Sequence, residues 1–226
     1  MAMLRLVKRA ILKSRIPPSP RMEFGNALLA YGQWLREHPA QEHYATRDAL
    51  YAAIARGIGD VAFDFLEAGV YKGESLRSWT RLSQNKGTRF FGFDTFTGLP
   101  GAWQTGLKTF PAGHFNAGGQ PPDIQDARVQ FVSGRFQDTL PAFLQSYSSS
   151  AQLVVHLDAD MYSSTLFFLT CLHERLVTGT YLLFDNFSVA THDFRAFRDY
   201  TNAYDRTYEV VATAEPDYEK VAMRLI

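Results

Sequence analysis

Residues 152–162 read QLVVHLDADMY, a short apolar run that ends in two acids. Residues 153–157 have the length and the β-branched content of a buried central strand. Asp158 and Asp160 follow that strand directly, with one alanine between them. Ligands of open α/β sheets bind beyond the carboxyl ends of the strands, so acids at that place indicate chemistry. The run therefore predicts a central strand with a functional site at its end.

A second run, residues 179–184, repeats this pattern and ends in Asp185 and Asn186. Two neighbouring strands that end in oxygen ligands can hold a hard divalent cation between them. The alternative is that these residues cap the helices that follow, because Asp and Asn favour that position. Capping accounts for one acid per strand end, but not for D-x-D at one end and D-N at the other. We therefore favour a cation site.

The composition fits one large soluble domain with a substantial core. The chain has 226 residues, of which 46% are hydrophobic and 20% charged, and two domains of this total size would be cramped. A formal net charge of zero argues against nucleic acid as the main partner. The single cysteine, Cys171, excludes an internal disulfide and a thiolate-rich zinc site. There is neither an apolar stretch of membrane-spanning length nor a secretory signal, so we expect a cytoplasmic enzyme.

The first 60 residues differ in pattern from the rest of the chain. Residues 1–22 form a basic amphipathic leader, predicted to be helical up to the proline-rich segment 16–20. The leader either is mobile or packs against a partner, for example in a homo-oligomer formed through the N-terminal helices. A role at a membrane surface is the weaker interpretation, because the basic run is short. Residues 23–60 are predicted to form two helices that cover the sheet.

Residues 61–226 alternate strands with helices and end in two strands joined by a turn. Such alternation predicts a parallel sheet, and the terminal hairpin adds an antiparallel strand. We therefore predict an α/β fold, Rossmann-like and doubly wound, with a mostly parallel seven-stranded sheet and an antiparallel C-terminal hairpin. The long loop over residues 95–126 is rich in Gly and Pro, and loops of this length are usually lids or binding elements.

The turn after the first core strand reads FLEAGVYKGES. It lacks both the P-loop motif and G-x-G-x-x-G, because Val70 and Tyr71 stand where the second glycine is needed. Glu67, just before the turn, would repel a pyrophosphate but suits a ligand with an amino group and a sulfonium. Asp94, at the end of the next strand, is placed to accept hydrogen bonds from a ribose. Acid, glycine turn and second acid together suggest S-adenosylmethionine (SAM), although the glycines alone would be weak evidence.

Four motifs carry a resemblance to known enzymes. LEAGVYKGES resembles the cofactor motif of class I SAM-dependent methyltransferases, with the spacing of catechol-type O-methyltransferases. FGFDTFTGLP, GRFQDTLPAFL and LDADMYSST are similar to blocks of the macrocin-type family, which methylates sugar hydroxyls of antibiotics. The match covers about residues 61–200, and the ordered set is far more specific than any single block.

The resemblance implies roles for individual residues. Those implied to bind SAM lie in the first turn and at the two following strand ends: Glu67, Gly69, Tyr71, Gly73, Ser75, Asp94, Gly134 and Phe136. Among them, Ser75 would lie near the carboxylate of SAM, Asp94 at the ribose, and Gly134 and Phe136 close to the adenine. Asp158, Asp185 and Asn186 would hold Mg²⁺, and Asp160 would be the catalytic base. Two departures stand out. The macrocin-type pattern usually has two acids where this chain has Asp185 and Asn186, a pair found in catechol-type enzymes. The catechol-type catalytic lysine is replaced by Met161, so that base cannot be transferred.

We thus expect a magnesium-dependent O-methyltransferase that acts on a hydroxyl of a small molecule, a sugar or a glycosylated natural product. The long loop, with Trp103 and His114, would close over the acceptor. Asp160 is the first candidate for the base, His114 the second, and His192 a further one. The alternatives are an NAD(P)-dependent oxidoreductase, against which the missing G-x-G-x-x-G counts, and a non-catalytic SAM-fold assembly protein. The latter would not need an intact set of acids.

Overall fold

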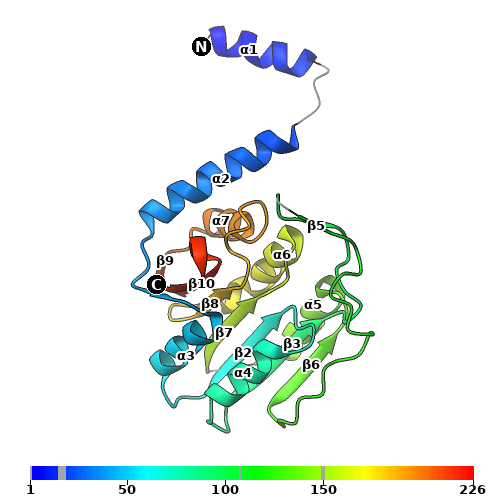
Figure 1. Ribbon diagram of the computed structural model, residues 1–226, viewed down its shortest axis with the longest axis vertical. Coiled ribbons are helices and arrows are strands. Elements are labelled where there is room, and N and C mark those ends of the chain that lie inside the picture. Colours follow the sequence, from blue (N-terminus) through cyan, green and yellow to red (C-terminus); the bar gives the residue numbers. More distant parts are fainter. Residues whose placement is uncertain (1, 15–18, 107, 149–150) are drawn as a thin grey trace.

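An eight-stranded sheet forms the centre of the structure, with strand order β1-β9-β10-β8-β7-β2-β3-β6 (Figure 1). The computed structural model describes residues 2–14, 19–106, 108–148 and 151–226. The strands of this sheet are β1 (Glu42–Tyr44), β2 (Phe63–Ala68), β3 (Arg89–Asp94), β6 (Val129–Ser133), β7 (Gln152–Leu157), β8 (Tyr181–Phe184), β9 (Tyr208–Ala214) and β10 (Lys220–Leu225). β10 runs antiparallel to both of its neighbours, and the other pairs are parallel.

The predicted fold class is confirmed: the sheet is mostly parallel and closes with an antiparallel C-terminal hairpin. All seven predicted strands are present. The eighth strand, β1, was not predicted, because three residues in a polar context show no strand periodicity. β1 exists through its parallel pairing with the edge strand β9.

Helices cover both faces of the sheet, as a doubly wound fold requires. They are α3 (Arg47–Ile58) and α4 (Glu74–Leu82) on one face, and α5 (Phe136–Ser146), α6 (Tyr162–Leu172) and α7 (Asp193–Ala203) on the other. Alternate residues of β2 serve the two cores: Phe63 and Phe65 pack with α3 and α4, and Leu66 and Ala68 pack on the opposite side. Glu67, which falls on the α3–α4 face, is therefore a buried acid in an apolar layer.

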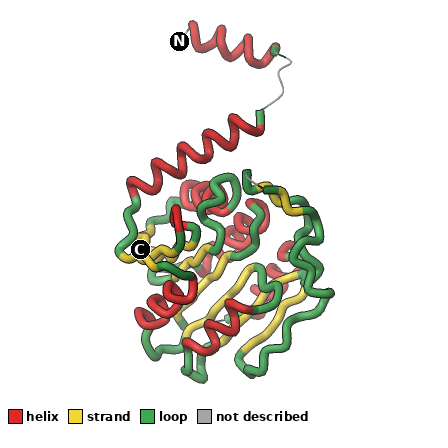
Figure 2. Tube along the Cα trace, in the orientation of Figure 1, coloured by secondary structure: helices red, strands yellow, loops and turns green. Residues whose placement is uncertain are grey.

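The two N-terminal helices differ in how they meet this core. α1 (Ala2–Lys13) lies apart from the rest of the chain, and its described side chains are exposed (Figures 1 and 2). α2 (Pro20–Glu37) buries Tyr31 and Trp34 against aromatic rings that flank α7. Thr46 caps the N-terminus of α3, since its hydroxyl accepts a hydrogen bond from Ala49 N. The division of the chain at residues 22 and 60 stays a prediction. None of the described helices has the length and apolar character needed to cross a membrane.

The long loop after β3 carries a small antiparallel ladder, β4 (Trp103–Gln104) with β5 (Thr109–Phe110). Phe24 of α2 reaches this loop, where a Cβ on Gly106 would overlap the Phe24 ring. The loop and α2 therefore meet over the carboxyl ends of the strands.

Candidate active site

A cavity of about 1210 Å³ opens at the carboxyl ends of the parallel strands. Its floor comes from the strand ends: Gly69, Tyr71, Asp94, Asp158, Asp160, Asp185 and Asn186. Its apolar wall comes from α2 and the long loop: Phe24, Leu28, Tyr31, Leu35, Trp103, Phe110 and Phe115. The cavity thus borders the strand-end acids that the sequence analysis singled out.

The acids beyond β7 and β8 converge on one point of the floor. The Asn186 amide nitrogen donates to Asp160 Oδ1 at 3.1 Å and to Asp158 Oδ1 at 3.4 Å. Burial, reinforced by the nearby acids, raises the pKa of Asp158 well above its usual range and that of Asp160 to about 8. Buried carboxylates that repel one another are stabilised by a cation, so this cluster fits a divalent ion.

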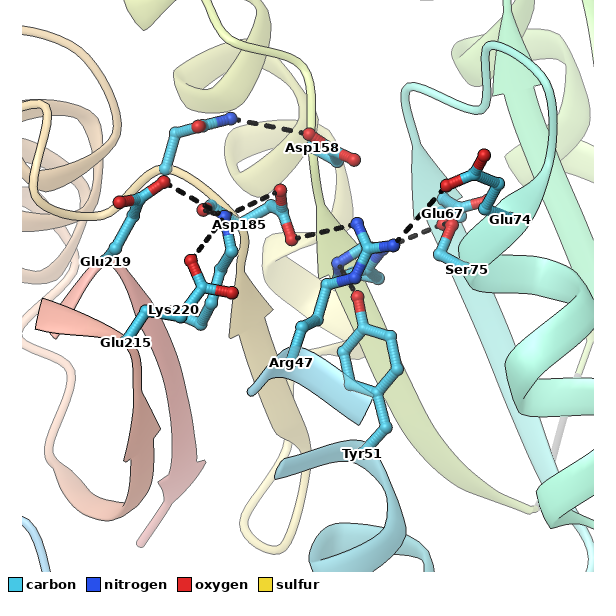
Figure 3. A network of polar contacts seen from close by, with 12 residues as sticks. Arg47, Tyr51, Glu67, Glu74, Ser75, Asp158, Asp185, Glu215, Glu219 and Lys220 are labelled. Carbon is cyan, nitrogen blue, oxygen red and sulfur yellow. Dashed lines mark hydrogen bonds and ion pairs between the residues drawn. The ribbon is translucent and has the colours of Figure 1, made fainter. Parts of the chain in front are cut away.

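Asp185 is held by Lys220, a residue that the sequence analysis missed. The Lys220 ammonium donates to the backbone oxygen of Asp185 at 2.6 Å and to its Oδ2 at 3.1 Å (Figure 3). It also lies near Glu215 and Glu219. The sequence does show a lysine at the start of the apolar strand β10, but its partner Asp185 lies 35 residues earlier in the chain. Lys220 therefore fixes the carboxylate of Asp185 at the edge of the cluster.

His156 also lies near the cluster, within 4.8 Å of ligand atoms of Asp158 and Asp185. Its Nε2 is 2.8 Å from the Tyr51 hydroxyl and its Nδ1 is 2.8 Å from Glu67 Oε1. Since a neutral imidazole has one donor and one acceptor nitrogen, both are engaged. A cation at this place therefore meets carboxylate and amide oxygens rather than His156.

The first glycine turn packs directly against the acid-bearing strand. Gly69 has φ of +90°, and a Cβ there would overlap the carbonyl oxygen of Asp158. Gly73, with φ of +75°, precedes α4, and a Cβ there would lie 2.8 Å from Pro122. Both positions therefore need glycine, the first because no other residue lets the two backbones approach this closely.

Asp94 fixes this turn and lies beside the cavity. Its Oδ2 accepts from the backbone N–H groups of Val70 and Tyr71, both at 2.8 Å. Gly134 N donates to the Asp94 carbonyl at 2.9 Å. Phe136, the first residue of α5, lines the cavity, whereas Gly134 supports it from below. Asp94 Oδ1 accepts one hydrogen bond, from Phe96 N at 2.8 Å, and its second acceptor site gives Asp94 capacity for a ligand hydroxyl.

Glu67 and Ser75 lie beneath the cavity wall and not on its surface. Both are buried, and the Ser75 hydroxyl donates to Glu67 Oε1, which also contacts His156. Among the described residues, Glu67 Oε2 has no hydrogen-bond partner. A buried carboxylate oxygen without a donor is costly, so Glu67 Oε2 would gain from any ligand donor that reached it.

The two histidine candidates for the base lie outside the cavity lining. His114 is exposed at the rim, where its ring packs 4.4 Å from the Phe115 ring centroid. His192 accepts from Tyr162 N at 3.1 Å and contacts the Gln104 carbonyl at 3.0 Å, so both ring nitrogens are used. Burial lowers the pKa of His192. Of the three candidates, Asp160 is the one that borders the cavity.

The whole structure is similar to solved O-methyltransferases. NovP covers 91% of this chain and 99% of its own, with a TM-score of 0.58 and 20% identity. The calicheamicin methyltransferase CalS11 has a TM-score of 0.63 and 19% identity, and the match covers 92% of this chain and 94% of its own. A structure of cmcI described as Mg-SAM has a TM-score of 0.53 and 17% identity, and the match covers 80% of this chain and 72% of its own. These likenesses show that the chain has the Rossmann-like fold of these structures.

Residues 46–213 match the macrocin O-methyltransferase (TylF) family. Because that is more than half of the chain, it belongs to this family of SAM-dependent methyltransferases, and the predicted resemblance is confirmed.

Two relatives agree with this assignment. A 4'-O-methyltransferase acting on 8-demethyl-8-(2,3-dimethoxy-alpha-L-rhamnosyl)-tetracenomycin-C, from Streptomyces olivaceus, is 27% identical over 58% of each chain. Demethyldecarbamoylnovobiocin O-methyltransferase from Streptomyces niveus is 23% identical over 67% of this chain and 63% of its own. The match spans less than two thirds of the length of either relative.

Proposed function

We propose that this chain is a magnesium-dependent O-methyltransferase that moves the methyl group of SAM to a hydroxyl of a sugar or of a glycosylated small molecule. The observation that carries the proposal is one cavity that joins the glycine turn, the acid cluster and a large apolar wall. When bound, SAM supplies an activated methyl group and Mg²⁺ lowers the pKa of an acceptor hydroxyl. The chain's own residues must hold and align these groups.

The glycine turn and its neighbours would hold SAM. Gly69 and Gly73 let the backbone approach the ligand, and Asp94 has acceptor capacity for a ribose. Phe136 offers an apolar surface for an adenine at the start of α5. The unpartnered oxygen of Glu67 fits the amino group of the methionine part. Tyr71, Ser75 and Gly134 support this surface through the turn and the strand ends.

Asp158, Asp185 and Asn186 would hold Mg²⁺. Their oxygens suit this ion, and three protein ligands leave positions for acceptor oxygens and water. The raised pKa of Asp158 supports this, since burial and neighbouring carboxylates make the anionic form costly without a cation. The magnesium in the description of cmcI, which shares the fold, agrees with it.

Asp160 would accept the proton of the acceptor hydroxyl. Its carboxylate borders the cavity and is oriented by the Asn186 amide. His192 is engaged through both nitrogens, and His114 sits on the exposed rim. Asp160 is therefore the first choice, and His114 the second.

The apolar wall favours an acceptor that is polar at one end only. A free sugar would leave the exposed parts of Phe24 and Leu28 uncovered, whereas an aglycone would cover them. The name of the Streptomyces olivaceus relative describes a molecule that carries a rhamnosyl group. We therefore favour a glycosylated acceptor over a free sugar.

The test is a panel of free sugars, nucleotide sugars and glycosylated aromatic compounds, each incubated with the protein and SAM and followed by mass spectrometry. We expect a methylated product from at least one glycosylated compound. Calorimetry with S-adenosylhomocysteine and NADPH separates the alternatives. Tight NADPH binding without a response to S-adenosylhomocysteine would indicate an oxidoreductase. Binding of S-adenosylhomocysteine without any turnover would favour an assembly role.

A further inference from the structure

Arg47 is a basic residue beside the acid cluster, and no role could be assigned to it from the sequence. It is the first residue of α3, and the Thr46 cap fixes where that helix starts. Figure 3 shows Arg47 reaching from α3 toward the strand ends, between Asp185 on one side and Glu67 and Ser75 on the other. Its guanidinium lies 3.6 Å from Asp185 Oδ1 and 3.9 Å from Glu74 Oε2.

Neither of these contacts has the distance of a hydrogen bond. Within the described parts of the chain, no N–H group of the Arg47 guanidinium has a hydrogen-bond acceptor, although its side chain is only 27% exposed. A guanidinium offers five donors in a planar fork that matches a carboxylate. Lys220 holds Oδ2 and the backbone oxygen of Asp185, whereas Oδ1, without a hydrogen-bond partner among the described residues, faces Arg47 only as an ion pair. The N–H groups of Arg47 are therefore free to bind a ligand carboxylate. Arg47 is not among the residues that line the cavity, and its guanidinium carbon lies 5.8 Å from the centroid of the Tyr51 ring.

The charges around this space indicate which ligand fits. SAM, the cofactor of the proposed function, carries an ammonium and a carboxylate at its methionine end. The free oxygen of buried Glu67 suits the ammonium, but the negative charge of Glu67 would repel the neighbouring carboxylate. Lys220 is committed to Asp185 and its neighbouring glutamates. Arg47 is placed to compensate this repulsion.

We propose that the Arg47 guanidinium binds the α-carboxylate of the methionine part of SAM. Arg47 is thus a cofactor-binding residue contributed by the helix before the core and not by the glycine turn. This inference rests on the proposed function, because it assumes that SAM occupies the cavity. It assigns to α3 a direct part in cofactor selection: ligands without an amino-acid carboxylate gain nothing from Arg47.

The test compares two ligands that differ in this carboxylate, measured by calorimetry. S-Adenosylhomocysteine carries it, and 5′-methylthioadenosine lacks the whole amino-acid end. Arg47→Met should weaken the affinity for S-adenosylhomocysteine roughly 10- to 100-fold, which is the contribution of a charge-assisted hydrogen bond. The affinity for 5′-methylthioadenosine should stay within about twofold of that of the unaltered protein. Arg47→Lys should lose less, because it keeps the charge without the fork. Arg56→Met, an exposed position on the last turn of the same helix, is the matched control and should change neither affinity.

Unchanged affinity of Arg47→Met for S-adenosylhomocysteine would overturn the inference while leaving the proposed function intact. An equal loss for both ligands would also overturn it, since Arg47 would then merely shape the site. Failure of the unaltered protein to bind either ligand would instead remove the proposed function, and the inference with it. The thermal unfolding midpoint of each variant shows that the comparison is made between folded proteins.

Discussion

Asp160 has φ of +61°, in the left-handed region that non-glycine residues rarely adopt. Such strain persists where the surroundings fix it, and it is common at functional sites. Here the side chain accepts a hydrogen bond from the Asn186 amide and borders the cavity. The backbone conformation thus turns the second acid of D-x-D toward the site rather than into a helix cap.

Asp160→Asn keeps the shape of the side chain but removes its basicity. We expect kcat to fall by a factor on the order of 10²–10⁴, the usual worth of a general base, with unchanged affinity for S-adenosylhomocysteine. Steady-state kinetics and calorimetry provide the two readouts. Near-normal turnover of this variant together with an inactive His114→Ala would move the assignment to His114.

Gly69→Ala tests the close approach of the turn to β7. A Cβ at Gly69 is opposed both by the φ of +90° and by overlap with the Asp158 carbonyl. We therefore expect Gly69→Ala to lower the free energy of unfolding by more than about 2 kcal/mol, and to weaken the binding free energy of S-adenosylhomocysteine by a similar amount. Gly113→Ala is the control, with φ of +79° and no atom within 4 Å of the added methyl. It should cost only about 1 kcal/mol. Equal losses in chemical denaturation would show that the overlap is relieved by a small shift.

For single residues, the sequence predicted where the acids lie in the fold better than it predicted which side chains contact them. The acids Asp158 and Asp185 could be placed because strand ends of a parallel sheet share one edge. Lys220 and Arg47 could not, since their contacts depend on how β10 and α3 dock. His156 reads as one more strand residue, and its bonds to Tyr51 and Glu67 arise only in the folded core.

At the scale of elements, α2 and the long loop after β3 form the apolar wall of the cavity. Sequence patterns predicted a helix and a binding loop, but not that Phe24 would pack on Gly106. Periodicity reports which face of one element is apolar and says nothing of which distant element covers it. The short strands β4 and β5 escaped prediction for the same reason as β1, because two or three residues carry no period.

Phe24→Ala removes a ring from this wall. We expect KM for a glycosylated acceptor to rise roughly 5- to 30-fold through lost apolar contact, with affinity for S-adenosylhomocysteine unchanged. Leu29→Ala, at a position of the same helix that is 74% exposed, is the control and should leave KM as it is. A loss of cofactor affinity in Phe24→Ala would place α2 at the cofactor instead of the acceptor.

At the scale of the whole molecule, the alternation of strands and helices predicted the doubly wound sheet because each element carried a clear period. α1 is not part of this alternation, and its apolar face, with Met3, Val7 and Ile11, is exposed. No described contact joins its side chains to the acid cluster. Assembly, rather than chemistry, is therefore the property that α1 is expected to affect.

Removal of residues 1–19 should leave S-adenosylhomocysteine affinity unchanged and alter the oligomeric state or the solubility. Light scattering after size-exclusion chromatography measures the oligomeric state, and the full chain at the same concentration is the control. Complete loss of cofactor binding in the shortened chain would show that the leader builds part of the site.

The central claim is metal-assisted methyl transfer, and its most direct measurement is the initial rate of methyl transfer from SAM to a glycosylated acceptor as free Mg²⁺ is varied. We predict that excess chelator abolishes the rate, that Mg²⁺ restores it, and that Asp158→Ala stays inactive at every Mg²⁺ concentration while folding normally. Full activity in excess chelator would contradict the account and reduce the strand-end acids to helix caps.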